Sequence, residues 1–514
     1  MTAIGGQGDA VDRLDLRLVP AAVTGWAATA AGIVWHAGAA LAAALGAVAI
    51  TAAAARWIAV RGKSLAMAGG IGATVLAAVC AGAGFAIAIG LRVQDLRDHP
   101  VTMRYGTEGT VVVTPAESPR TVGGRMMFRG SLNYLDDAET YGRVLVFASA
   151  RGFADLAAGQ PAAFRARIDR PTSRDLTVAV LSAAGRPTPG EAGPILRAAQ
   201  RVRSGFADAA RRALPPDQAA MLPALVLGDT SAVSGRTTDD FRTSGLAHLT
   251  AVSGANVTIV CGAVLAAAAL IGPRGAVALA ALALVAFVIV VQPSASVLRA
   301  AAMGAVTLLA VLTHRRRQAI PALSASVIAL LISAPALAVD AGFALSVSAT
   351  AALILIAPVW SRRLTTRGWP KPLADVVSIA AAAQVVTAPL VAGMSGTLSL
   401  ISVAANIAVA AVIPPITVIG TAAAALNTLW PAGAQLLIRF TGPELWWLLR
   451  VAGWAAGVPG SSVPVPSGPL GVLLVALCGA ALVLGWRSRW LRVGVVGGAV
   501  CLLAWTLAGH VGSA

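Results

Sequence analysis

The sequence predicts a polytopic α-helical membrane protein of about eleven to thirteen spans that carries an inserted extracytoplasmic small all-β domain. Of its 514 residues, 57% are hydrophobic and only 12% are charged, against roughly a quarter charged in ordinary soluble chains. Apolar stretches of roughly 20 residues, the length that crosses a bilayer, recur throughout. A single long polar region, residues 92–215, interrupts them. Acidic residues lie among the first twenty and no cleavable apolar run follows, so we expect no removable signal peptide.

Residues 1–91 are expected to hold about three spans. Residues 18–60 are rich in Ala and Gly and break near Trp35, which leaves room for two short spans, and a further apolar run covers 65–91. Arg56, Arg61 and Lys63 lie between them and place that loop in the cytoplasm by the positive-inside rule. The run over 65–91 therefore ends outside, and the polar region after it is expected to be extracytoplasmic.

Residues 92–190 have the pattern of a compact β-domain. Short runs rich in β-branched and aromatic residues are separated by Gly, Pro, Ser and Asp, and they cover residues 109–114, 125–135, 142–149, 162–170 and 175–182. Five strands in about eighty residues fit a small barrel of the OB kind, and a small sandwich would give the same pattern.

One face of this β-domain is a candidate DNA-binding surface. In the fourth run, Phe164 and Ile168 alternate with Arg165 and Arg167, so the two arginines share the face opposite the core. That face is either a groove for a phosphate backbone or an ordinary solvated strand face. Candidate stacking surfaces for bases are the aromatic residues Phe128, Tyr134, Tyr141 and Phe153.

Residues 191–216 predict a basic amphipathic helix that ends at Pro215–Pro216. Ile195, Val202 and Phe206 recur at helical spacing, while Arg197 and Arg201 belong to the polar remainder. Such a helix beside a membrane span is typical of one lying in the lipid interface, and direct contact with DNA is the alternative.

Residues 217–514 are expected to form the main membrane domain. Near its start, the polar segment 228–256 leads into a long apolar run. Its candidate functional residues are Asp229, His248, Ser253 and Asn256. If the protein were a serine hydrolase, Ser253 and His248 would have to act together. They are five residues apart, however, so on a helix their side chains lie on different faces. The alternatives are the mouth of a conduit, or a purely structural role in capping and close packing.

Later apolar stretches predict alternating spans near 246–270, 275–292, 296–313, 320–338, 342–358, 374–394 and 397–426. Both basic clusters between them, residues 314–317 and 362–371, then fall in the cytoplasm. A Trp-rich stretch over 435–454 is amphipathic and is open to crossing, re-entering or lying at the interface.

Isolated polar residues inside the apolar half are further candidates. Arg299, Asp340, Gln384 and Asn406 lie in apolar surroundings, where a charge costs on the order of 3 kcal/mol at mid-bilayer. Snorkelling would explain the first two, and interhelical hydrogen bonding the other two. Pro389, Pro414 and Pro415 interrupt helices nearby, which favours a water-filled conduit over a solid bundle.

Other chemistry is not visible in the sequence. The formal charge of +17 suits anionic lipid or a polyanion but is also what genome composition would give. The cysteines and histidines are scattered, so we expect no disulfide framework, metal site or cofactor. No Walker A sequence occurs, so we expect no ATPase activity.

Several ordered motifs together resemble the ComEC competence family, the inner-membrane channel for uptake of transforming DNA. ALVLGDTS followed by TSGLAHLTAVSGAN resembles its first signature, and PSASVLRAA and DAGFALSVSAT resemble its later segments. Gln384 with Pro389, and Asn406 with Pro414, match its Gln/Pro and Asn/Pro features. The resemblance implies translocation of single-stranded DNA across the cytoplasmic membrane.

Two departures from the family pattern shape the expectation. Asn256 stands where many members carry histidine, and the metallo-β-lactamase-like domain of larger members is not found, so we expect a short form with no enzymatic activity. The partners implied are the lipid bilayer, single-stranded DNA, a separate nuclease, a DNA receptor and a cytoplasmic motor ATPase, and assembly into an oligomer is open. A transporter of a small solute or lipid is the alternative function.

Overall fold

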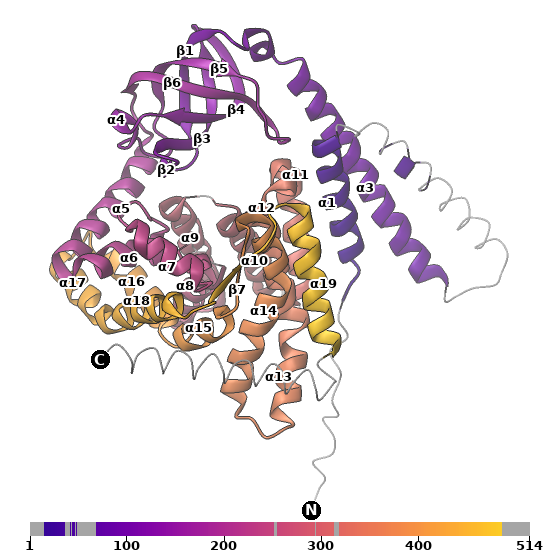
Figure 1. The fold of residues 1–514 in the computed structure, drawn as a ribbon, viewed down its shortest axis with the longest axis vertical. Coiled ribbons are helices and arrows are strands. Elements are labelled where there is room, and N and C mark those ends of the chain that lie inside the picture. The colour runs from indigo at the N-terminus through magenta and orange to yellow at the C-terminus, as the bar shows by residue number, and fades with distance from the viewer. Residues whose placement is uncertain are drawn as a thin grey trace, which may run out of the picture. The chain divides into compact units, whose positions relative to one another are not determined.

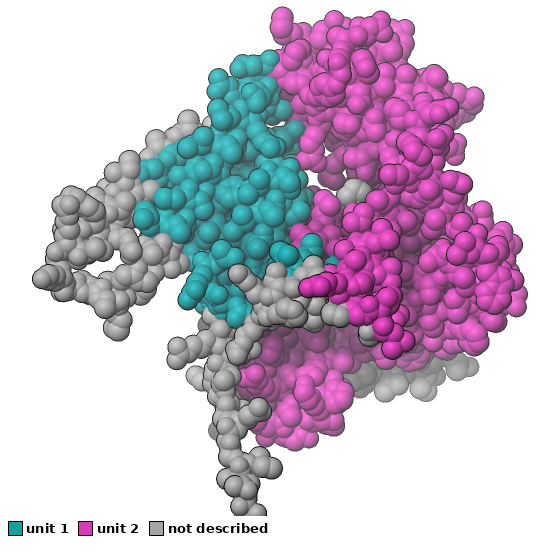
Figure 2. All heavy atoms as spheres, turned by 180° about the vertical axis from the view of Figure 1, so that it is seen from behind, with its two compact units in different colours: residues 1–98, 174–176, 305–339 teal, residues 99–173, 177–304, 340–514 magenta. Residues whose placement is uncertain are grey.

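The computed structural model describes residues 15–35, 68–250, 254–292, 294–312 and 318–485, with isolated positions between 42 and 48. The chain forms two compact units, which Figure 2 colours separately. One comprises residues 1–98, 174–176 and 305–339, and the other comprises residues 99–173, 177–304 and 340–514.

The first unit is a small helical bundle of α1 (Val19–Trp35), α3 (Ala68–Arg97) and α11 (Ala319–Ser333), with the 3-10 helix η4 (Pro335–Val339). Helix α1 packs against α3 and α11. The backbones of α1 and α3 approach closely, since a Cβ on Gly32 would lie 2.4 Å from Ile89 Cγ2. The Trp26 indole donates to the Ala338 carbonyl at 2.8 Å. The second short span predicted before residue 60 lies outside the described residues.

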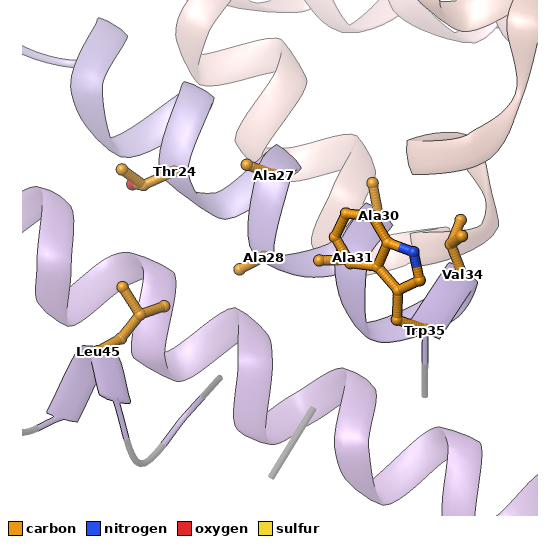
Figure 3. A pocket seen from close by; sticks show the side chains of 8 residues that line it. All are labelled: Thr24, Ala27, Ala28, Ala30, Ala31, Val34, Trp35 and Leu45. Carbon is orange, nitrogen blue, oxygen red and sulfur yellow. The ribbon is translucent and has the colours of Figure 1, made fainter. Parts of the chain in front are cut away.

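An apolar pocket lies along α1 in this unit (Figure 3). Its lining is mostly alanine, with Trp35 and Leu45. The one hydroxyl there, that of Thr24, donates to Ala78 O of α3 at 2.8 Å. This pocket offers no polar chemistry and is not the functional site.

The β-domain begins after η1 (Pro100–Arg104) and is a closed barrel (Figure 1). Its strands are β1 (Glu108–Pro115), β2 (Arg120–Val122), β3 (Arg125–Leu135), β4 (Ala138–Ala148), β5 (Ala162–Asp169) and β6 (Thr177–Pro189). The sheet order is β1-β5-β6-β4-β3-β2, and pairing of β1 with β3 closes a five-stranded barrel. All pairings are antiparallel except β4 with β6. This confirms the predicted OB-like domain over a sandwich.

Alternating burial along the strands builds the barrel core. Phe164, Ala166 and Ile168 are buried on β5, as the alternation predicted. The short helix α4 (Ala150–Phe153) inserts Phe153, whose ring lies 5.2 Å from that of Phe164. Phe128 and Phe153 are wholly buried, so they are core residues and the prediction that they offer stacking surfaces is wrong. Tyr134 and Tyr141 are exposed.

The helical half contains α5 (Pro194–Ala213), α6 (Pro216–Leu227), α7 (Gly235–Thr243), α8 (Gly254–Ala267), α9 (Pro273–Val291), α10 (Ala295–Leu312), α12 (Ala341–Leu355), α13 (Ala357–Thr365), α14 (Lys371–Ser395), α15 (Ser402–Val409), α16 (Ile413–Leu426), α17 (Pro431–Phe440), α18 (Gly442–Gly457) and α19 (Pro469–Gly485). The 3-10 turns η2 (Ala247–Leu249) and η3 (Ala268–Ile271) lie before and after α8, and β7 (Thr397–Ser399) pairs with β8 (Ser462–Pro464).

Among the described residues, four helices are long and apolar enough to cross a membrane: Val75–Arg104, Arg274–Val291, Ala341–Thr365 and Lys371–Ser395. Further apolar helices are shorter, namely Val19–Trp35, Asn256–Ala267, Ala295–Ala310, Ala319–Ser333 and Pro469–Val483. These helices, with the inserted barrel, confirm the predicted polytopic membrane fold. The total of about eleven to thirteen spans stays a prediction.

The span predicted over 397–426 starts later than expected and is broken, as Pro414 and Pro415 indicated. Residues 397–399 form β7, and α15 and α16 follow with a bend of 55° between them. Pro414 and Pro415 at the start of α16 lack the N–H groups that would continue the ladder from α15. The indole of Trp447 on α18 donates to Ala408 O at 2.9 Å, which satisfies one of the carbonyls left free at the end of α15.

The structure shows how the two segments that were predicted to be amphipathic pack. The apolar face of α5, including Phe206 and Ala209, is buried and packs on α6, α9 and α17. Protein rather than lipid therefore covers the face on which the interfacial interpretation of residues 191–216 relied. The Trp-rich stretch forms α17 and α18, and neither is among the candidate spans. Whether it crosses, re-enters or lies at the interface stays a prediction.

Candidate functional site in the helical half

The polar segment 228–250 connects the end of α6 to α8 through a series of tight turns. Gly228 ends α6 in the left-handed conformation (φ 69°), which favours glycine. Ser234 then caps α7 by accepting from Thr237 N at 3.1 Å, and Gly245 makes a second left-handed turn (φ 76°). Phe241 and Leu246 are buried to either side of that turn. The segment is thus anchored at both apolar residues and exposes its polar ones.

Gly245 brings this segment against α15. A Cβ on residue 245 would lie 2.4 Å from Ser402 Oγ and 2.5 Å from Ser402 Cβ. No side chain fits in that space, so the Gly-Leu-x-His-Leu motif requires glycine here both for its φ angle and for this contact.

Ser402 joins two of the predicted site residues into one network. Its hydroxyl donates to Gln384 Oε1 at 2.9 Å, and Asn406 Nδ2 donates to Ser402 O at 2.8 Å. Gln384 Nε2 donates to Ser399 O of β7 at 3.3 Å. We call Gly245, Gln384, Ser402 and Asn406 the polar cluster. It joins α14, β7, the start of α15 and the turn before η2.

Arg299 lies apart from this cluster, on α10. Its Nε donates to Ser346 Oγ at 2.7 Å and its Nη1 to Thr350 Oγ1 at 2.6 Å. Both hydroxyls belong to α12, and the residue is only 5% exposed. The side chain of Arg299 is therefore directed between α10 and α12, and it does not snorkel to a membrane surface.

Asp340 has a structural role at the start of α12. Its Oδ1 accepts from Phe343 N at 2.8 Å, which is an N-cap, and caps of this kind stabilise a helix by about 1 kcal/mol. Asn256 is likewise buried, and its Nδ2 donates to Leu225 O of α6 at 3.0 Å. Neither residue joins the polar cluster.

Asp229 lies beside a buried arginine. Its Oδ1 accepts from Ser231 Oγ at 2.6 Å, and its Oδ2 lies 3.9 Å from Arg203 Nη2. Arg203 Nη1 donates to Leu227 O at 2.8 Å and to Val290 O at 3.0 Å. Burial lowers the pKa of Arg203 from its ordinary value, and the charge of Asp229 opposes that shift.

Arg203 thus holds the ends of two helices together. Leu227 ends α6 and Val290 lies in the last turn of α9, where backbone carbonyls are left unpaired and favour a cation. No role was predicted for Arg203 from the sequence. Its position three residues before buried Phe206 was the signal that it lies on the packed face.

His248 is exposed on η2, with Nδ1 at 3.2 Å from Gly245 O. Ser253 lies outside the described residues, so the serine hydrolase interpretation stays a prediction. Across the described ranges, no three histidine, cysteine, aspartate or glutamate side chains gather where a metal ion would bind.

Three of the four candidate DNA-binding arginines on β5 and α5 lie beside carboxylates. Arg165 lies 3.5 Å from Glu108, Arg167 lies 3.2 Å from Asp169 and Arg197 lies 3.5 Å from Glu191. Arg201 is exposed on α5, with no carboxylate within ion-pairing distance in the described chain. Exposed pairs of this kind contribute little and exchange readily for another anion.

Sequence reasoning missed Ser402, Ser346 and Thr350, which supply the hydroxyls around Gln384 and Arg299. A signal was present for all three. Ser402 precedes Asn406 by four residues, and Ser346 and Thr350 are also four apart, so each pair lies on one helix face.

The comparisons with known proteins agree with the motifs. The family model described as competence protein matches residues 225–490, just over half of the chain. No curated protein and no solved structure matches the chain. The matched range contains the polar cluster, Arg299 and both ends of the broken span, and it confirms the resemblance drawn from the motifs. The chain is a membrane protein that belongs to the competence protein family, which supports a role in DNA uptake during competence.

Proposed function

We propose that this protein moves single-stranded DNA across the cytoplasmic membrane during natural competence. The observation that carries the proposal is the polar cluster, which lies at the start of α15 in the broken span that α15 and α16 form. Irregular backbone at membrane depth is tolerated where it is buried in protein or lines a water-filled cavity. The broken span carries Ser402 and Asn406, and Ser402 donates to Gln384 of a second span. The surface between these two spans therefore presents hydrogen-bonding groups rather than apolar side chains.

The polar cluster includes Gly245 in the turn before η2, which links the segment 228–250 to the start of the broken span. Gly245 lies against Ser402, so the most polar stretch of the helical half and its least regular span meet at one place. In the proposed path, DNA enters beside the exposed His248 and passes the hydroxyl and amide groups of the polar cluster.

We assign the barrel the capture of the strand on the outer side. The basic loops near 56–63 and 362–371 support a cytoplasmic position for those loops and hence an extracytoplasmic barrel. Barrels of this class bind single strands by combining a basic groove with aromatic stacking. Tyr134 and Tyr141 are the exposed aromatic rings of the barrel strands, and Arg201 supplies an exposed charge nearby in sequence.

In this proposal the protein is a conduit and not an enzyme. Each phosphate moved against a potential that is negative inside costs about 2.3 kcal/mol per 100 mV. A cytoplasmic motor ATPase would supply that work, a separate nuclease would remove the second strand, and a DNA receptor would deliver the duplex.

Reconstitution tests the proposal. Full-length protein in liposomes with a potential negative outside should accumulate labelled single strands in a nuclease-protected form, and duplex DNA of the same sequence should stay outside. Equal protection in liposomes without protein would contradict the proposal. Protection of a small anion but of no DNA would favour the alternative, a small-solute transporter. In a host that demonstrably takes up DNA, deletion of the gene should abolish entry of labelled strands.

A further inference from the structure

Helix α18 presents an exposed arginine between two exposed tryptophan rings. The guanidinium carbon of Arg450 lies 5.7 Å from the centre of the Trp446 ring and 5.2 Å from that of Trp454. Each neighbour along this series is four residues from the next, so all three side chains share one face of the helix. Trp446 and Trp454 are 51% and 55% exposed. We call Trp446, Arg450 and Trp454 the tryptophan–arginine ladder.

The opposite face of α18 is packed against protein. Its buried residues are Leu445, Leu448, Val451, Ala452 and Ala455, and the helix packs on α6, α7, α15 and α16. The ladder therefore lies on the face that the described part of the chain leaves open.

Contacts within the protein fix the ladder in place. The Trp447 indole donates to Ala408 O of α15 at 2.9 Å, and the Trp454 ring lies edge-on to the Trp447 ring with centroids 6.2 Å apart. The two rings of the ladder attract the charge of Arg450. Within the described ranges, the guanidinium has no hydrogen-bond or ion-pair partner. Its N–H donors are therefore available to a ligand that brings oxygen acceptors.

The position of Arg450 along α18 distinguishes crossing the membrane from lying on it. Helix α18 has 16 residues, a length of about 24 Å against about 30 Å of hydrocarbon. Arg450 lies near the middle, so a crossing helix would expose its charge to lipid at mid-bilayer, at a cost on the order of 3 kcal/mol. A helix lying in the interface places the same charge among headgroups, where tryptophan is also enriched. The ladder fits the second arrangement.

The surroundings of the ladder indicate lipid rather than nucleic acid. Helix α17, directly before α18, exposes Leu436 by 55% and Phe440 by 62%. Together the two helices contain two cations, Arg439 and Arg450, and one carboxylate, Glu444. Sites for single strands combine aromatic rings with a positively charged groove that follows the backbone. A surface with large exposed apolar side chains and a net charge of this size instead suits a phospholipid, whose acyl chains cover the apolar groups.

We propose that the tryptophan–arginine ladder binds the headgroup phosphate of an anionic phospholipid. This site goes beyond the proposed function and does not depend on it. Arg450 donates to the phosphate oxygens, and the two indoles lie at the border between headgroups and acyl chains. The single negative charge of phosphatidylglycerol is balanced by one guanidinium, whereas phosphatidylcholine brings its own cation beside Arg450. Because α18 packs on α7 and α15, the bound lipid also holds those helices at the membrane surface.

Native mass spectrometry of the full-length protein tests the site, with phosphatidylglycerol and phosphatidylcholine titrated separately into detergent. At equal lipid concentration, Arg450→Gln should retain one phosphatidylglycerol fewer than the wild type, because this site is weakened about fivefold. The number of phosphatidylcholine molecules retained should not change. Arg186→Gln, at an exposed arginine of β6, controls for the loss of one charge and should retain both lipids as the wild type does.

A second variant tests the role of the rings. Trp446→Leu combined with Trp454→Leu keeps the charge and the apolar character but removes the surfaces that hold the guanidinium. It should lose the same phosphatidylglycerol, and adding Arg450→Gln should cause no further loss. All three residues are exposed, so the thermal midpoint without added lipid should stay that of the wild type.

The outcomes separate the site from the function. Wild-type retention of phosphatidylglycerol by either Arg450→Gln or the tryptophan variant overturns the site, and so does an equal loss of both lipids. If Arg450→Gln weakens binding of oligothymidylate while lipid retention is unchanged, the ladder belongs to the DNA path and the proposal is also overturned. If liposomes show no DNA transport but phosphatidylglycerol retention depends on Arg450, the site stands and the proposed function fails.

Discussion

Gly245 and Ser402 are in contact so close that residue 245 has no room for a side chain: a Cβ there would lie 2.4 Å from Ser402 Oγ. Residue 245 belongs to the segment that leads into α8, and residue 402 begins the broken span. This contact makes the segment 228–250 and the polar cluster one site rather than two.

The Gly245→Ala variant should lose DNA transport and some stability. Its φ of 76° disfavours any residue with a Cβ, at a cost of about 1–3 kcal/mol, and the methyl group would also push Ser402 away from Gln384. Transport into liposomes and the thermal midpoint measure the two effects. Gly235→Ala is the control, because nothing lies within 4 Å of a Cβ there. Wild-type transport by Gly245→Ala would show that the contact has no functional role.

The Ser402→Ala variant should reduce transport while leaving the fold intact. It deletes the hydroxyl that donates to Gln384 Oε1 at 2.9 Å, and an unmet hydrogen bond at this half-buried amide costs about 1 kcal/mol. Combined with Gln384→Ala, the double variant should show a coupling of about 0.5–3 kcal/mol in transport rate. Ser395→Ala, an exposed serine of α14, is the matched control. Strict additivity of the two changes would mean that the pair does not act together.

The Arg203→Met variant should be destabilised more than any exposed arginine variant. Removing the guanidinium leaves the carbonyls of Leu227 and Val290 unpaired and Asp229 without its counter-charge, for a loss of about 3–5 kcal/mol. Thermal unfolding in detergent measures this. Arg201→Met, on the exposed side of α5, should change the midpoint little, and equal effects of the two substitutions would refute the assignment.

Replacing Tyr134 and Tyr141 by serine should weaken single-strand binding and leave the barrel folded. Both rings are exposed, and stacking of a base on an aromatic ring is worth about 1–3 kcal/mol. Anisotropy titration with oligothymidylate measures the loss. Val122→Ser removes an exposed apolar side chain of β2 that has no aromatic face, and it serves as the control. An unchanged affinity in the tyrosine variant would remove the barrel's stacking role.

Periodicity was sufficient to predict the barrel strands and most helices, because burial repeats every second residue in β5 and apolar runs match the spans. Pro414 and Pro415 indicated the interruption that follows Val409. Periodicity could not predict β7, because its pairing with β8 joins residues more than sixty positions apart. Such a pairing depends on tertiary contact and has no local sequence pattern.

The candidate site was predicted less well than the fold. Gln384 and Asn406 were identified from their polarity, and the structure brings them together through Ser402. Asp340 and Asn256 were selected by the same reasoning, yet one caps a helix and the other joins α6 to α8. Polarity in an apolar stretch shows that a group needs a partner, but the identity of that partner depends on packing that a single sequence does not contain.

The β7–β8 ribbon also imposes an order on biosynthesis. Ser399 O, which accepts from Gln384 Nε2, is held by a strand whose partner ends at Pro464. The ribosome must therefore deliver α15, α16, α17 and α18 to the membrane before the ribbon can close. Until then the strand that holds the acceptor of Gln384 is unpaired, and a chain arrested before residue 464 would present its polar groups to the insertion machinery and to quality-control proteases.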